Sequence, residues 1–205
     1  MEKMDTTGSN KADFAAFAEL VCSLVRVPNP QYEVNGEPGE AALAKAVVAW
    51  LKAHNIQTVE CDLEWGVHAV LTGPDGAGTR PGILLAAHLD SDHLNTPDVS
   101  KVAVDGTKLL TPGQVGLDCK TGVAIALSVL ERLQGRPGAW QVHILFTVGE
   151  EAGQKGAIRA PIARLLGGKV RPLPSSSPPP LPPPPPPPSS CSSSTFSATV
   201  TLNLR

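Results

Sequence analysis

One stretch decides the fold: Phe146-Thr147-Val148-Gly149-Glu150-Glu151-Ala152-Gly153. An apolar run of strand length ends there in two adjacent carboxylates and a glycine. Further upstream, the apolar run 82–87 ends in His88-Leu89-Asp90, and Asp118 opens a stretch with helical spacing. Because open α/β sheets place their ligands beyond the ends of buried strands, we expect these polar side chains to meet at one edge of a sheet.

Apolar spacing along the rest of the chain alternates between the period of a helix and that of a strand. It predicts helices over 11–26, 40–54, 121–133 and 156–166, and strands over 59–71, 83–87 and 140–148, with a hairpin at 102–104 and 108–110. The run 83–87 is continuously apolar, which is typical of a strand buried on both faces. The pattern predicts an α/β fold with a mixed, largely parallel sheet flanked by helices.

The composition changes abruptly near residue 171, and more than half of the 21 prolines follow that point. The run Pro182–Pro188 is unbroken, and such a segment favours solvated polyproline II over a packed core. We therefore predict an α/β unit over 1–170, a disordered Pro/Ser-rich segment over 171–194, and an unassigned tail over 195–205.

Charge and cysteine content exclude several classes of function. The net charge of -2 gives no electrostatic basis for binding nucleic acid or an anionic membrane. The four cysteines are scattered without a Cys-x-x-Cys pair, so neither a zinc knuckle nor a disulfide framework is indicated. No apolar run reaches membrane-spanning length, and the first residues are polar, so a cytoplasmic protein is expected.

The polar residues at the strand ends form a plausible set of metal ligands. Imidazole together with carboxylates suits zinc, and a carboxylate can bridge two ions. Asp90 lies two residues after His88, so it can orient the imidazole from the same side of an extended segment. Glu150 and Glu151 reach one cavity only if the backbone turns there, which Gly149 and its neighbours permit. Each residue also has an ordinary interpretation when it is considered alone. A histidine after a strand is commonly a structural hydrogen-bonding residue, a pair of glutamates is commonly solvated surface, and Asp118 would be the N-cap of the helix that follows it.

The motifs together resemble a known family, the co-catalytic zinc peptidases that include peptidase T, aminoacylase and glutamate carboxypeptidase. The segment 87–90 resembles the His-x-Asp motif of that family, 116–122 its Gly-x-Asp-x-Lys-x-Gly motif, and 146–157 its Glu-Glu-x-Gly-x-x-Gly-Ala motif. The resemblance covers roughly residues 14–166. The wording around the glutamate pair is most similar to the peptidase T branch, which implies an aminopeptidase that acts on short peptides.

The resemblance also implies a role for each site residue. His88 would bind one zinc ion, Asp118 would bridge two, and Glu151 would bind the other. Glu150 would be the general base, and Asp90 would orient His88. The resemblance further implies a cis peptide bond between Asp118 and the next residue, Cys119, whose own side chain has no role in the family.

The same resemblance implies ligands that the sequence does not supply. The family has a further acidic ligand after the glutamate pair and a histidine near the C-terminus, with a lid or dimerisation domain between them. After Glu151 the sequence contains no Asp, Glu or His. We therefore expect a truncated or mis-spliced form with little or no peptidase activity of its own, and a homodimer only for a full-length form.

Two other kinds of function fit parts of the sequence. Pro182–Pro188 could bind SH3, WW or profilin-type modules, which recognise polyproline through aromatic grooves. Alternatively, the chain is a catalytically dead regulatory paralogue that keeps the fold without the chemistry. Zinc content separates the hydrolase from the regulatory hypothesis.

Overall fold

The computed structural model describes residues 6–27, 29, 36–56, 58–77, 82–91, 103–105, 108–111, 116–167 and 198–201. The helices are α1 (Thr6–Val25), α2 (Ala41–Ala53), α3 (Leu117–Leu133), α4 (Lys155–Arg159) and α5 (Ile162–Leu165). The strands are β1 (Thr58–Asp62), β2 (Gly66–Thr72), β3 (Ile83–His88), β4 (Ala103–Asp105), β5 (Lys108–Thr111), β6 (Gln141–Thr147) and β7 (Ala198–Thr201). The predicted segments 171–194 and Pro182–Pro188 lie outside the described residues.

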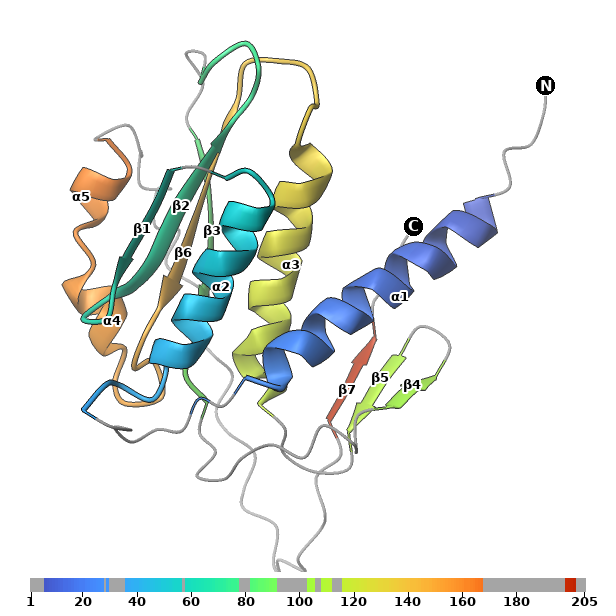
Figure 1. Ribbon diagram of the computed structural model, residues 1–205, viewed down its shortest axis with the longest axis horizontal. Coiled ribbons are helices and arrows are strands. Elements are labelled where there is room, and N and C mark those ends of the chain that lie inside the picture. The colour runs from blue at the N-terminus through green and yellow to red at the C-terminus, as the bar shows by residue number, and fades with distance from the viewer. Residues whose placement is uncertain are drawn as a thin grey trace, which may run out of the picture.

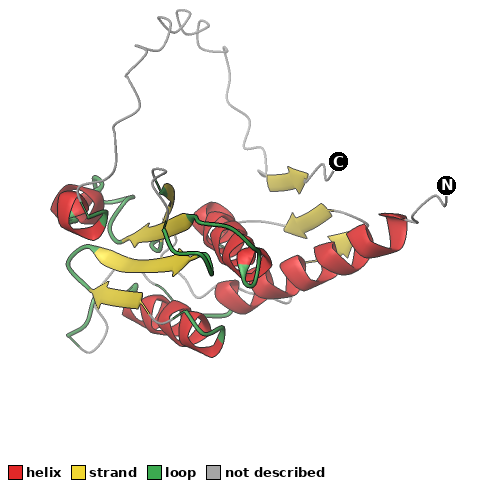
Figure 2. Cartoon of the chain, turned by 90° about the horizontal axis from the view of Figure 1, so that it is seen from above, coloured by secondary structure: helices red, strands yellow, loops and turns green. Residues whose placement is uncertain are grey.

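The main sheet has the strand order β1-β2-β6-β3 and lies between two layers of helices. Helices α2 and α3 cover one face, while α4 and α5 lie on the other side (Figure 1 and, from above, Figure 2). A smaller sheet with the order β4-β5-β7 lies near α1. The predicted α/β fold with a helix-flanked mixed sheet is therefore confirmed.

The share of parallel pairing is smaller than the sequence suggested. Among the strands that the structure describes, only β3 and β6 pair in parallel, whereas β2 is antiparallel to both β1 and β6. The reason lies in the connections, because a short turn can join only antiparallel strands and a parallel pair needs a long crossover. The turn between β1 and β2 spans only residues 63–65, whereas the connection from β3 to β6 includes α3.

Two expectations about individual strands were wrong. The segment 59–71 forms two strands, β1 and β2, because the chain reverses in the turn at 63–65 and Gly66 adopts a positive φ of 134°. The strand β3 is only partly buried, and Ile83 is 61% exposed. Among the described strands it lies at one edge of the main sheet and pairs with β6 alone, and its side chains are less covered than those of the more central β6.

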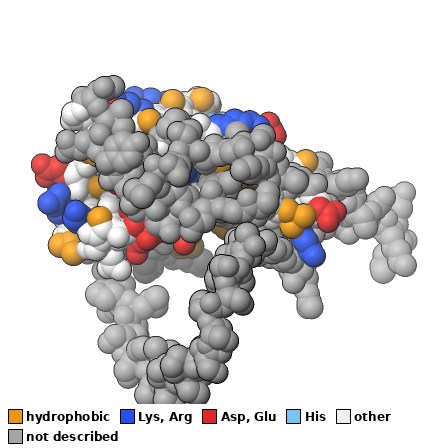
Figure 3. All heavy atoms as spheres, turned by 90° about the horizontal axis from the view of Figure 1, so that it is seen from below, with side chains coloured by type: hydrophobic (Ala, Val, Ile, Leu, Met, Phe, Trp, Pro, Cys, Tyr) orange, Lys and Arg blue, Asp and Glu red, His pale blue; other side chains and the backbone are white. Residues whose placement is uncertain are grey.

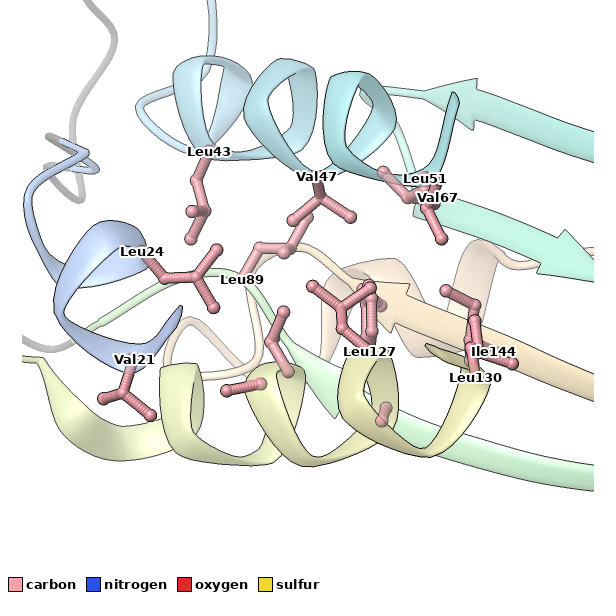
Figure 4. Packing of buried hydrophobic residues seen from close by; sticks show 14 of the residues in the cluster. Val21, Leu24, Leu43, Val47, Leu51, Val67, Leu89, Leu127, Leu130 and Ile144 are labelled. Atoms are coloured by element: carbon pink, nitrogen blue, oxygen red, sulfur yellow. The ribbon is translucent and has the colours of Figure 1, made fainter. Parts of the chain in front are cut away.

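Apolar side chains from three helices and the sheet form the main core. Leu43 and Val47 of α2 point toward Leu127 and Leu130 of α3, with Leu89 between the two helices (Figure 4). A smaller cluster on the opposite face joins Trp65, Leu145 and Leu165. The expected helix over 156–166 is divided into α4 and α5 around Pro161, whose ring cannot continue the helical hydrogen bonding.

Among the described residues, no helix is long and apolar enough to cross a membrane. The hairpin predicted at 102–104 and 108–110 is confirmed as β4 and β5, which pair in antiparallel register. In the region expected to be an unassigned tail, β7 adds to this hairpin through its pairing with β5.

Candidate metal centre

Three elements end or begin at the same edge of the main sheet (Figure 1). The parallel register places His88, the last residue of β3, opposite Thr147, the last residue of β6. Helix α3 begins beside them at Leu117, which brings Asp118 to the same edge. In the view from below, acidic side chains are scattered beside basic and hydrophobic ones on the described part of the surface (Figure 3). Strand pairing thus brings together residues that are 60 or so positions apart in the sequence.

The chain turns sharply after β6. Gly149 and Gly153 adopt φ values of 60° and 94°, a region that favours glycine because it has no Cβ. The turn lets Glu150 and Glu151 approach the imidazole together, and donor atoms of His88, Glu150 and Glu151 lie within 4.8 Å of one another. The expectation that both glutamates reach one site through a glycine-assisted turn is met by this geometry.

The imidazole of His88 has different partners at its two nitrogens. Its Nδ1 lies 3.1 Å from the backbone oxygen of Asp90 and 3.3 Å from its carboxylate Oδ1. Its Nε2 lies 3.3 Å from Oδ1 of Asp118 and 4.0 Å from Oε2 of Glu150. Asp90 supplies both acceptors near Nδ1, so a proton is held on Nδ1, while Nε2 faces the carboxylates of Asp118 and Glu150.

Asp90 is the buried support of the site. Its side chain is 3% exposed, and its two carboxylate oxygens accept the backbone N–H groups of Glu150 at 3.0 Å and Glu151 at 2.8 Å. Burial alone would raise the pKa of Asp90, but hydrogen bonds from His88 and from these two amides lower it below its usual value. Asp90 therefore ties the end of β3 to the turn after β6.

The carboxylate of Asp90 also determines the pKa of the His88 imidazole. The hydrogen bond with Asp90 raises the pKa of His88 to about 9, against the opposing effect of burial, and the charges of Asp118 and Glu150 add to the rise. An imidazole surrounded by carboxylates is thus strongly attractive to positive charge, whether a proton or a metal ion.

The donor set fits zinc in both chemistry and spacing. Two nitrogen or oxygen ligands of a tetrahedral zinc, each about 2.0–2.1 Å from the ion, lie roughly 3.3 Å apart. The distance between Nε2 of His88 and Oδ1 of Asp118 is 3.3 Å. A zinc-binding histidine usually donates its other ring N–H to a carboxylate or a carbonyl, as Nδ1 does here toward Asp90.

The start of α3 is irregular at the residues that face the site. Asp118 and Cys119 have non-helical dihedral angles, and the peptide bond between them is cis, as expected. The preceding Gly116 has a positive φ of 68°. The Asp118 carboxylate, whose side chain is 86% exposed, lies 3.3 Å from Nε2 of His88.

The sequence analysis missed a buried polar network behind the site. Lys120 is 1% exposed, and its Nζ donates to Oδ1 of Asn29 at 2.6 Å. Asn29 in turn donates to the backbone oxygen of Leu89 at 2.8 Å and to Ser91 at 3.2 Å. Burial lowers the pKa of Lys120 to about 8. The network holds the segment that carries Asp90.

A signal for this network was present in the spacing. Lys120 occupies the same helical stripe as Val123, Ala124 and Leu127, which are all buried. A lysine at a core position of an amphipathic helix needs a buried polar partner. The pattern could therefore have indicated that Lys120 is buried, although nothing in the sequence identified Asn29 as its partner.

Comparison with known proteins agrees with this geometry. Residues 110–163 match the family of M42 glutamyl aminopeptidases. The structure resembles aminopeptidase PepT of Bacillus cereus, at 18% identity and a TM-score of 0.59, over 75% of this chain and 41% of that one. It also resembles human carnosine dipeptidase 1, at 13% identity and a TM-score of 0.59, over 80% of this chain and 38% of that one.

A third similar structure is the dipeptidase Dug1p of Saccharomyces cerevisiae, at 12% identity and a TM-score of 0.53, over 73% of this chain and 36% of that one. No curated protein matches the sequence. The chain spans less than half the length of each of these solved structures. The expected resemblance to zinc peptidases of the peptidase T type is therefore confirmed for the fold.

Proposed function

We propose that this chain carries part of the catalytic unit of a metal-dependent hydrolase of peptide bonds, most similar to an aminopeptidase that acts on short peptides. The observation that supports it is the approach of His88, Asp118, Glu150 and Glu151 at one sheet edge, with donor atoms within 4.8 Å in each of two groups that share His88. The M42 match over 110–163 includes three of these four residues.

In this proposal the site would take two zinc ions. His88 would hold one ion through Nε2, Glu151 would hold the other, and the Asp118 carboxylate would serve as a ligand to both. Bound zinc would supply Lewis acidity to a water molecule and to the carbonyl of the scissile bond. Asp90 acts through His88, because its carboxylate keeps the proton on Nδ1 and thereby leaves Nε2 available as a ligand.

Glu150 is the proposed general base. Its Oε2 lies 4.0 Å from Nε2 of His88, and its side chain is 38% exposed, so it faces both the site and the solvent. The carboxylate would accept a proton from the attacking water and return it to the leaving amine of the peptide. The hydrogen bond from its own backbone N–H to Asp90 holds the base in place.

We further propose that these 205 residues alone hydrolyse peptides weakly or not at all. His88 and Asp118 offer two protein ligands to one ion, and Glu151 and Asp118 offer two to the other. Residues 152–205 contain no Asp, Glu or His. A hydrolytic zinc ion usually has three protein ligands, so with these ligands alone both ions would be held weakly.

Zinc affinity tests the metal site, and peptide cleavage tests the activity. Zinc binding, measured by competition with a chromophoric chelator, should weaken in His88→Ala and stay unchanged in the control His54→Ala, whose imidazole stacks on Trp50 away from the site. Equal zinc affinity in the two variants would refute the metal site.

The cleavage assay uses zinc-loaded protein with di- and tripeptides, and Glu150→Gln is its control. We expect turnover that does not differ from that of the control. Robust turnover that Glu150→Gln abolishes would contradict the proposed inactivity and would show that the further ligands come from elsewhere, such as a second copy of the chain.

A further inference from the structure

We propose that the thiol of Cys119 is a metal ligand, so that His88, Asp118 and Cys119 together hold one thiophilic divalent ion without Glu151. The proposal reverses the expectation that the Cys119 side chain has no role. It rests on the proposed function only in taking His88 and Asp118 as ligands.

The geometry of the three donors supports this site. An imidazole nitrogen of His88, a carboxylate oxygen of Asp118 and Sγ of Cys119 all lie within 4.8 Å of one another. Around a tetrahedral zinc with a sulfur ligand at about 2.3 Å and a nitrogen ligand at about 2.1 Å, these two atoms lie roughly 3.6 Å apart. The upper limit of 4.8 Å is compatible with this spacing, and the carboxylate of Asp118 already lies 3.3 Å from Nε2 of His88.

The local backbone explains how two successive residues face one point. In a regular helix, neighbouring side chains differ by about 100° in direction and cannot both face the same ion. Asp118 has φ and ψ of -85° and 117°, and Cys119 has -105° and 27°, so neither has helical geometry. The irregular start of α3 therefore allows the carboxylate and the thiol to approach His88 together.

Glycine at position 122 leaves the space that the thiol occupies. A Cβ at Gly122 would lie 2.5 Å from Sγ of Cys119 and 3.4 Å from Cβ of Ala87. The same position therefore lies close to both the thiol and Ala87, the residue that precedes His88 on β3. Any larger residue at 122 would push the sulfur out of this position.

The ligand atoms of His88, Asp118 and Cys119 determine which metal ions the site would prefer. One thiolate, one imidazole and one carboxylate make three protein ligands, the number typical of a zinc ion that keeps a position for a reacting molecule. A thiolate favours zinc, cobalt or cadmium over magnesium and calcium. Zinc displaces the thiol proton, which passes to the solvent. Cys119 thus supplies the third protein ligand that one ion lacks in the proposed dinuclear arrangement.

Two ligand sets share His88: one adds Asp118 and Cys119, and the other adds Glu150 and Glu151. Variants distinguish them. Cys119→Ser removes the thiolate of the first set and keeps nearly the same size, whereas Glu151→Gln removes a ligand of the second set alone. Cys61→Ser is the matched control, because Cys61 is an exposed free thiol. The full chain is titrated with Co²⁺, and the near-ultraviolet band of a sulfur–cobalt bond is recorded; zinc affinity is measured by chelator competition.

We expect the band in the wild type, Cys61→Ser and Glu151→Gln, and no band in Cys119→Ser. Zinc affinity should fall in Cys119→Ser by about tenfold or more, since even outer-shell changes have effects of that size. A sulfur–cobalt band that persists in Cys119→Ser would overturn the proposal. Binding lost in Glu151→Gln but kept in Cys119→Ser would also overturn it while leaving the proposed function intact.

A second measurement uses the wild-type chain, so its result does not depend on whether the Cys119→Ser variant folds. Saturating zinc should slow the alkylation of Cys119 by iodoacetamide by about tenfold or more relative to Cys61, as read from the two peptides by mass spectrometry. Equal alkylation of the two thiols with and without zinc would refute the role of Cys119 as a ligand.

Discussion

Replacement of Asp90 by asparagine removes the charge that joins the two halves of the site. The buried carboxylate accepts N–H groups from Glu150 and Glu151 with separate oxygens, at 3.0 and 2.8 Å. Asparagine has only one acceptor oxygen, so one of the two amides would face an NH₂ group and lose its partner. The same substitution also removes the carboxylate that contacts Nδ1 of His88.

The size of the effect follows from these contacts. A hydrogen bond to a charged group contributes about 1.5–3 kcal/mol, and a buried donor without a partner costs about 1–3 kcal/mol. Asp90→Asn loses one charged bond and weakens the other to a neutral one, so we expect the free energy of unfolding to fall by about 3–5 kcal/mol. This is a large part of the roughly 5–15 kcal/mol by which domains are stable.

Urea denaturation followed by tryptophan fluorescence measures the loss, with Asp62→Asn as the matched control. Asp62 is exposed and accepts the N–H of Glu64 at 2.8 Å, so the same substitution there should cost less than about 1 kcal/mol. Amide hydrogen exchange gives a second readout, because Glu150 and Glu151 should lose protection. A cost at Asp90 no greater than that at Asp62, with both amides still protected, would refute this account.

Three further changes test the rest of the structure by urea denaturation. Asn29→Ala should lower the free energy of unfolding by about 2–4 kcal/mol, because the buried Lys120 loses its partner at 2.6 Å; a cost near zero would contradict this. Burial lowers the pKa of His68 to about 4, with His143 adding to the shift. The unfolded chain therefore takes up the proton first, so His68 should contribute a fall in stability of about 3 kcal/mol between pH 6.5 and 4, and His68→Gln should reduce the slope by that contribution. Gly156→Ala should destabilise by about 1–3 kcal/mol, since a Cβ there would overlap the backbone of Val148; helix propensity alone predicts the opposite sign.

The sequence alone determined most of the helices and the order of the chemical motifs. The helices near 11–26, 40–54 and 121–133 follow from apolar spacing, which is a local property of the chain. The turn after β6 could also be foreseen, because glycines flank the glutamate pair and permit a positive φ there.

Properties that depend on neighbours could not be read in the same way. The run 83–87 has the composition of a fully buried strand, yet β3 lies at the edge of the four-stranded sheet with Ile83 largely exposed. The segment 59–71 contains a reversal that its apolar alternation does not mark. Strand order and pairing partners are long-range choices, and residue periodicity carries no information about them.

The same distinction between local and long-range properties applies to the candidate metal site. The sequence indicated that His88, Asp118, Glu150 and Glu151 are suited to bind metal, because ligand chemistry belongs to each side chain. Only the tertiary structure decided that Asp90 holds both glutamate amides and that Cys119 faces His88. Those contacts depend on the parallel register of β3 and β6 and on the irregular start of α3, which bring together groups that are far apart along the chain.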